Sequence, residues 1–362
     1  MAAVVPISRS HATASWLRHK AAASALAASA AMALFRLTGL APGAEHAQNP
    51  PQQFRFSSTL PRQLETARVA AAVVLAGSTH NACVIALGKN GKLSVGYGEL
   101  SRDTVVSLAA CDLYNASRET GSTELLDGAS LTARNIFLSG GYALSAGSVM
   151  TASRYLTTHT SPVADPYLRL EVPSHPGCTQ TRYRLDERKT ETISPGIYCS
   201  GIEVAGGATL NLNPGTYILD RGNFTVSGNS AVNGTGVTIV LTSRIGSNYG
   251  AVDIRAGSTI EITAPALGAT AGIPGIAIWV DGDQPAARDT FDGGSTQNIN
   301  GGIYLPGRQV KYSGGSSSAT RCSQLIAREV TFTGNSYFRH DCQGPACPTR
   351  TRHCSEPNNE IF

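Results

Sequence analysis

Short apolar runs recur through the second half of the chain, and each is bounded by glycine, asparagine, serine or proline. The runs are about three to five residues long and alternate apolar with polar positions, which is typical of half-buried β-strands. One class of run begins at Tyr217 and returns at Ile239, and further members begin at Ile276, Ile303 and Leu325. This spacing, roughly 20 residues with insertions, predicts a β-solenoid with two or three short strands in each coil.

The shortness of the runs argues for stacked coils rather than hairpins. A strand of this length forms no stable hairpin alone, but in a stack it pairs in parallel with the strands above and below it. Glycine and asparagine then occupy the corners, where the chain turns sharply. We therefore predict an all-β fold, a right-handed parallel β-helix with a short N-terminal hydrophobic or helical leader. An antiparallel β-sandwich is the alternative, because glycine-rich turns also suit that fold.

Composition agrees with this fold class and excludes others. Of the 362 residues 38 are glycine, while charged residues make up 15% and aromatic residues 6% of the chain. Since no Gly-X-Y period is present, the chain is not collagen-like. The formal net charge of +4 is small and dispersed, so we expect no nucleic-acid partner.

The chain is predicted to divide into four segments that differ in composition. They are a signal or anchor segment at 1–44, a linker with a short helix at 45–82, the parallel β-helix at 83–342 and a cysteine-containing tail at 343–362. Within the β-helix, residues 151–192 are rich in proline and charge, and we expect a surface excursion or connector there.

The leader has the features of an export signal. Basic residues at 18–20 precede an uncharged, alanine-rich run at 21–35, which Arg36 then interrupts. That run is short for a membrane span. A retained anchor over 21–40 and a disordered leader are the alternatives.

Eight cysteines and no CxxC spacing favour disulfides formed in an oxidising compartment. Proximity in the sequence suggests four pairs: Cys83 with Cys111, Cys178 with Cys199, Cys322 with Cys342, and Cys347 with Cys354. A zinc knuckle formed with His340, Asp341 and His353 is the alternative for the tail, although these spacings match no standard finger.

An acidic group follows the apolar run that ends at Val280. It comprises Asp281, Asp283, Asp289 and Asp292. Clustered carboxylates are candidate calcium ligands, and a solvated loop with Asx-turns is the simpler interpretation. Polysaccharide lyases of β-helical fold combine acidic calcium sites with a basic residue, for which Arg308 and Lys311 are candidates. Since no hydrolase elbow, zinc-protease motif or phosphate-binding loop is present, we assign no catalytic residue and expect no enzyme activity.

Polar positions of the runs are often threonine, serine or asparagine. Examples are Thr209, Asn211, Thr225, Ser227, Thr238, Thr259 and Thr331. A flat, regular array of such side chains suits binding of a glycan or another ordered surface. A hydrated outer face without a ligand is the simpler interpretation.

Several motifs together resemble a known family. They are Ser-Pro-Gly-Ile-Tyr-Cys at 194–199, Asn-Pro-Gly-Thr-Tyr-Ile-Leu at 213–219, Gly-Thr-Gly-Val-Thr-Ile-Val-Leu at 234–241 and Asn-Gly-Gly-Ile-Tyr-Leu-Pro at 300–306. In these motifs the chain is similar to the C-terminal region of TadG-like proteins of the tight-adherence (Flp) pilus system, over about residues 83–342. The resemblance implies an envelope protein that assists pilus assembly or anchoring, with its solenoid outside the inner membrane.

Three functional hypotheses follow. The first is a structural or accessory cell-envelope protein of Flp-type pilus assembly and surface adhesion. The second is a β-helical polysaccharide lyase or hydrolase, and the third is a passive glycan-binding adhesin module. We expect an exported protein of the periplasm or cell surface, with envelope or pilus-assembly proteins and surface glycan as partners and the N-terminus as a candidate membrane anchor.

Overall fold

The computed structural model describes residues 81–96, 104–108, 111–282, 287–292, 294–313 and 323–337. These residues form strands and turns without a helix, which confirms the prediction of an all-β chain. Accordingly, this part of the chain contains no helix with the length and apolar character needed to cross a membrane. The predicted leader and tail, and all but the end of the predicted linker, lie outside the described residues.

The strands fall into two series separated by a long connection. The first series is β1 (Ala82–Ala86), β2 (Leu93–Val95), β3 (Val105–Leu108), β4 (Asp112–Asn115), β5 (Thr123–Leu125), β6 (Ser130–Leu138), β7 (Tyr142–Leu144) and β8 (Val149–Thr157). The second series begins with β9 (Gln180–Leu185), β10 (Thr190–Ile193), β11 (Gly196–Val204), β12 (Thr209–Leu212), β13 (Gly215–Asp220), β14 (Phe224–Val226), β15 (Ala231–Thr235) and β16 (Val237–Thr242). It ends with β17 (Val252–Ile254), β18 (Thr259–Thr263), β19 (Ile276–Val280), β20 (Arg288–Phe291), β21 (Thr296–Tyr312), β22 (Ser323–Phe332) and β23 (Ser336–Tyr337).

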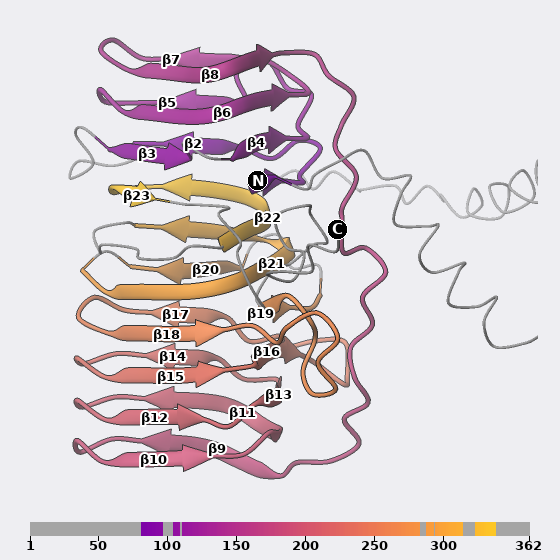
Figure 1. The fold of residues 1–362 in the computed structure, drawn as a ribbon, viewed down its shortest axis with the longest axis vertical. Helices are drawn as coiled ribbons and strands as arrows, with labels where there is room; N and C mark the ends of the chain where they lie inside the picture. Colours follow the sequence, from indigo (N-terminus) through magenta and orange to yellow (C-terminus); the bar gives the residue numbers. More distant parts are fainter. Residues whose placement is uncertain are drawn as a thin grey trace, which may run out of the picture. The chain divides into compact units, whose positions relative to one another are not determined.

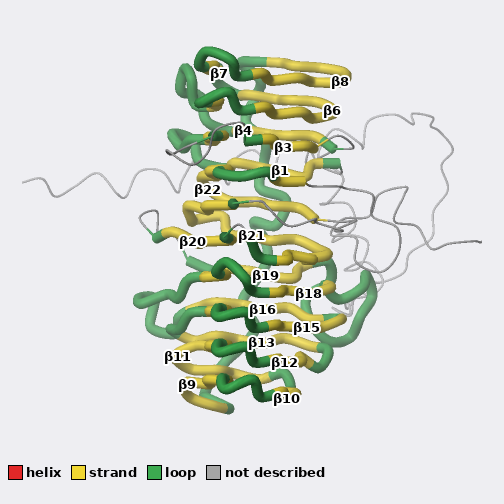
Figure 2. Tube along the Cα trace, turned by 90° about the vertical axis from the view of Figure 1, so that its left-hand side faces the viewer, coloured by secondary structure: helices red, strands yellow, loops and turns green. Residues whose placement is uncertain are grey.

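Pairing between these strands is parallel, and it defines three faces of a coil stack (Figure 1). On face 1, β13 pairs with β16 and β16 with β19. On face 2, β14 pairs with β17 and β17 with β20, and on face 3, β12 pairs with β15 and β15 with β18. Longer strands such as β11 run from one face to the next. Figure 2 shows the turns of successive coils above one another.

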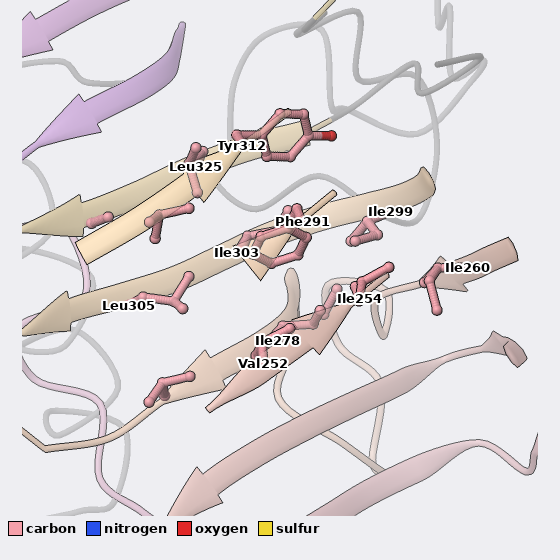
Figure 3. Close-up of a cluster of buried hydrophobic side chains, with 14 of the residues drawn as sticks. Val252, Ile254, Ile260, Ile278, Phe291, Ile299, Ile303, Leu305, Tyr312 and Leu325 are labelled. Atoms are coloured by element: carbon pink, nitrogen blue, oxygen red, sulfur yellow. The ribbon is translucent and has the colours of Figure 1, made fainter. Parts of the chain in front are cut away.

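Inward side chains from the three faces fill one core (Figure 3). Val252 from face 2, Ile260 from face 3 and Ile278 from face 1 are all fully buried. Strand β18 shows why the pattern works, because Ile260 and Ile262 turn inward while the alternate positions face outward. Each fully buried aliphatic side chain contributes roughly 1.5–3 kcal/mol, so this core is a main source of stability.

The coils do not follow one another in sequence order (Figure 1). Strand β1 pairs with β22 on one side and with β4 on the other, and β2 pairs with β22 and β5. Strand β3 pairs with β23. The first series of coils is therefore stacked on the last coils of the second series, and β9 begins at the opposite end of the stack.

Residues 158–179 join β8 to β9, and we call them the strap. They run along the side of the stack between these two strands (Figure 1). Their apolar side chains pack against the outward residues of face 1; these strap residues are Val163, Tyr167, Leu170 and Val172. Face 1 is thus buried on both sides, which explains why β19 is apolar at every position.

Polar contacts fix the strap at the junction of the two series. The Tyr304 hydroxyl donates to Asp165 Oδ2 at 2.7 Å, and the Tyr167 hydroxyl donates to Gln324 Oε1 at 3.0 Å. Gln324 in turn donates from Nε2 to the Ala82 carbonyl at 2.9 Å. One buried glutamine therefore links the strap, β22 and β1.

The excursion expected over residues 151–192 is shorter than predicted. Strand β8 continues to Thr157, β9 lies inside the expected range and β10 begins inside it, so only the strap leaves the coils. Its apolar side chains cover face 1, which leaves it only partly solvated. The prolines of the expected range all lie in the strap, whereas its charged residues also occur in the neighbouring strands.

Two of the predicted cysteine pairs are confirmed. Cys83 is bonded to Cys111, which joins β1 to the chain just before β4. Cys178 is bonded to Cys199, which joins the end of the strap to β11. The other four cysteines lie outside the described residues. Two disulfides agree with an oxidising compartment.

Candidate binding surface

The outward side of face 3 carries a regular polar array, which we call the Thr/Asn face. It lies on β10, β12, β15, β18 and the start of β21 and consists of Thr190, Thr192, Thr209, Asn211, Asn233, Thr235, Thr259, Glu261, Thr263, Thr296, Asn298 and Asn300. Ala231 interrupts it. Because adjacent coils pair in register, the array has a fixed spacing of about 4.8 Å between coils and about 6.6–7 Å along each strand.

The column through Asn233 shows how this register operates. Asn211 lies opposite Asn233, which lies opposite Glu261. The Asn233 amide donates to Asn211 Oδ1 at 3.2 Å, so the coil below orients the side chain above it. Glu261 in turn lies opposite Asn298. The result is a ladder of amide and carboxylate groups that runs along the stack.

A shallow groove of about 330 Å³ follows this ladder. Its polar lining comes from the ladder and from the next outward position of each strand: Asn233, Thr235, Glu261, Thr263, Asn298 and Asn300. Within the described ranges, the side-chain oxygen of Asn298 has no hydrogen-bond partner. The Thr/Asn face contains no aromatic side chain, so a ligand there would be held by hydrogen bonds rather than by ring stacking.

Sequence reasoning located only part of this face. Thr209, Asn211 and Thr259 belong to it, whereas Thr225 and Thr331 lie outward on face 2 and Ser227 follows β14. Thr238 points outward from face 1, as expected, since it alternates with the core residues Val237 and Ile239, but it is fully buried and is therefore not part of a solvated array. Its hydroxyl donates to the Ile276 carbonyl at 2.8 Å, since the segment before β19 covers it.

The predicted acidic group is not assembled as a metal site in the part of the chain that the structure describes, where no three His, Cys, Asp or Glu side chains are placed to hold an ion. Asp289 is fully buried against Arg308, and Asp281 accepts from the Thr242 hydroxyl at 2.9 Å. Asp292 is half-buried after β20, and Asp283 lies outside the described residues. Arg308 is buried as well, and Lys311 lies outward on face 2.

Three described aspartates are buried, and an arginine holds each of them. The pairs are Asp112 with Arg134, Asp220 with Arg221 and Arg244, and Asp289 with Arg308. At Asp220, burial favours a higher pKa, but the Arg244 N–H, the Arg221 guanidinium and both positive charges outweigh it and lower the pKa. A general acid must hold a proton near neutral pH, and a carboxyl with a lowered pKa does not. We therefore interpret the Asp220 pair as structural. At Asp289 burial raises the pKa although Arg308 and the Val252 N–H oppose it, and we interpret this pair as structural because both side chains are fully buried against each other.

No protein-family model, curated protein or solved structure matches the chain. The resemblance to TadG-like proteins stays a prediction from the sequence motifs. Function has to be argued from the surfaces themselves, and the most regular of these is the Thr/Asn face.

Proposed function

We propose that the chain is an exported structural protein of the cell envelope, that its coil stack is a right-handed parallel β-helix, and that its Thr/Asn face binds an extended, ordered surface glycan. The right hand is supported by general sterics, because about 98% of crossover connections between parallel strands are right-handed. Export is supported by the two disulfides.

The in-register polar array is the observation that carries the binding proposal. A polysaccharide in an extended chain presents hydroxyl groups at a fixed repeat, and hydroxyl, amide and carboxylate groups at a fixed repeat are their natural partners. The backbone of the array is held by pairing on every coil, so no backbone order must be gained on binding. Many weak contacts then add up along the polymer.

A structural role is favoured over catalysis because an arginine holds each buried aspartate of the described residues. The more specific role in Flp-type pilus assembly rests on the resemblance of the motifs around 194–241 and 300–306. It remains a prediction, separate from the glycan proposal.

Replacing Thr209 and Thr259 by lysine should abolish most binding to insoluble polysaccharide. Both threonines are half-buried at outward strand positions of the Thr/Asn face, and lysine there disturbs the flat array. We expect at least a tenfold loss of affinity when the protein is sedimented with purified peptidoglycan or microcrystalline cellulose. The matched control is Thr290→Lys with Thr331→Lys, which adds the same charges at half-buried outward positions of face 2. Equal binding by both double variants, or no binding by the wild-type protein, would overturn the proposal.

A further inference from the structure

A second hollow lies at the corner between faces 1 and 2 in the coils of β9, β11 and β13, and we call it the corner groove. Its volume is about 520 Å³, which falls in the range of small-ligand sites. Its lining includes Arg182, Arg184, Ser200, Glu203, Arg221 and Asn223. None of them belongs to the Thr/Asn face.

The backbone along this groove is strained in the same way on successive coils. Thr181, Cys199 and Asp220 are register partners, so the residues that follow them stack at one corner. These residues are Arg182, Ser200 and Arg221, and their φ angles are 53°, 65° and 57°. A non-glycine residue in this left-handed region costs about 1–2 kcal/mol, which glycine would avoid. Side chains kept at strained positions point to a functional requirement for them.

Glycine is present one position later on two of these coils. A Cβ atom on Gly222 would lie 1.9 Å from the Gly201 nitrogen, so the coils approach too closely for any side chain there. The corner thus combines one position that excludes side chains with a neighbouring position that carries them. Sterics require the glycines at 201 and 222, but they do not explain the side chains of Ser200 and Arg221 just before them.

The charges of the groove are unevenly neutralised. Arg184 is paired with Asp186 at 2.9 Å and with Glu203 at 2.8 Å, and Arg221 is paired with the buried Asp220 at 3.1 Å. Arg182 is exposed and has no hydrogen bond or ion pair to any described residue. One guanidinium is therefore available to an external anion.

We propose that the corner groove binds the carboxylate of an acidic sugar in an anionic polysaccharide, with Arg182 as the residue that takes the carboxylate. The planar guanidinium offers two parallel N–H donors to a carboxylate, a geometry that lysine lacks. Ser200 and Asn223 supply hydroxyl and amide groups for the sugar hydroxyls, and Glu203 can accept from them. This site is independent of the Thr/Asn face, and the corner groove is selective for acidic over neutral chains.

The test measures calorimetric binding of oligogalacturonate to the full chain and to Arg182→Gly. Glycine removes the guanidinium and also relieves the left-handed backbone, so this variant should fold at least as well as the wild-type protein. Losing a hydrogen-bonded charge contact should weaken binding at least tenfold. The matched control is Arg188→Gly, since Arg188 is also exposed with a φ of 58° but does not line the groove. We expect this control to bind within twofold of the wild-type protein.

Three results would overturn the inference. The first is an unchanged affinity for oligogalacturonate in Arg182→Gly. The second is an equal loss of affinity in both arginine variants, which would indicate diffuse charge attraction. The third is that the wild-type protein binds an uncharged oligosaccharide of the same length, or inorganic sulfate, as tightly as oligogalacturonate. The double variant Thr209→Lys with Thr259→Lys separates the two proposals, because it should keep its affinity for oligogalacturonate while losing insoluble polysaccharide.

Discussion

Asp289→Asn should lower the free energy of unfolding by about 3–5 kcal/mol, because it leaves a buried cation without its counter-charge. Arg308 is fully buried, donates from Nε to Asp289 Oδ2 at 2.8 Å, and donates from Nη2 to the Gly250 carbonyl at 3.0 Å. The second carboxylate oxygen accepts the Val252 N–H at 2.7 Å. Asparagine keeps the acceptor for Val252 but replaces Oδ2 by an amide NH2 donor, so Arg308 loses both its counter-charge and its Nε acceptor, while arginine cannot lose its proton in compensation.

Two controls isolate the effect of the charge, with urea unfolding of each purified variant as the measurement. Asp253→Asn removes a carboxylate that pairs with Arg255 at the surface, where ion pairs contribute about 0–1 kcal/mol. Replacing Asp289 by leucine and Arg308 by methionine together removes both buried charges, and it should cost far less than Asp289→Asn alone. A loss for Asp289→Asn no larger than that for Asp253→Asn would contradict a buried, charged pair.

Trp279→Ala should also destabilise the fold by about 3–5 kcal/mol and release the strap. Trp279 is only 3% exposed although it faces outward from β19, because the strap covers it. Its ring lies 6.2 Å from that of Tyr304, which in turn lies 5.3 Å from Tyr167 of the strap. Removing the indole therefore opens a cavity in the layer that holds the strap to face 1.

Limited trypsin digestion reports on the release directly, because Arg169 is an exposed site within the strap. We expect cleavage after Arg169 to accelerate in Trp279→Ala, in parallel with the loss of unfolding free energy. Tyr304→Phe is the matched control: it keeps the ring and removes only the hydrogen bond to Asp165, so it should cost about 1.5–3 kcal/mol. Unchanged cleavage and a loss below about 1 kcal/mol in Trp279→Ala would show that the strap does not depend on this layer.

The repeating runs predicted the strands of the second series, because each coil needs inward apolar residues and turn residues at its corners. The order of the coils could not be predicted. Val84 lies opposite Leu325, and no local pattern records a pairing between such distant segments. The cover of face 1 by the strap does have a signal in the sequence. A fully apolar run such as β19 indicates a strand that is buried on both sides of its sheet.

The acidic group at 281–292 shows a similar limit of prediction from the sequence. Asp289 was interpreted with its neighbours as part of a loop, but it stands two positions before the buried Phe291 in β20. Strand alternation places both side chains inward, so this carboxylate needed a buried partner. Nothing in the sequence identified Arg308 as that partner. The Thr/Asn face was located in part because its residues alternate with core residues, while the buried Thr238 depends on tertiary cover that no local pattern encodes.

Peptide mapping of the non-reduced protein, isolated from the envelope fraction of its source cells, tests most directly whether the chain is an exported, oxidised coil stack. Cys83–Cys111 and Cys178–Cys199 each join adjacent coils or the strap to a coil, so they report on compartment and coil register together. We predict that both linked peptides are recovered and that thiol labelling of these four cysteines is negligible. Free thiols at these positions would contradict export to an oxidising compartment, and cross-pairing of Cys83 with Cys178 or Cys199 would contradict the coil register.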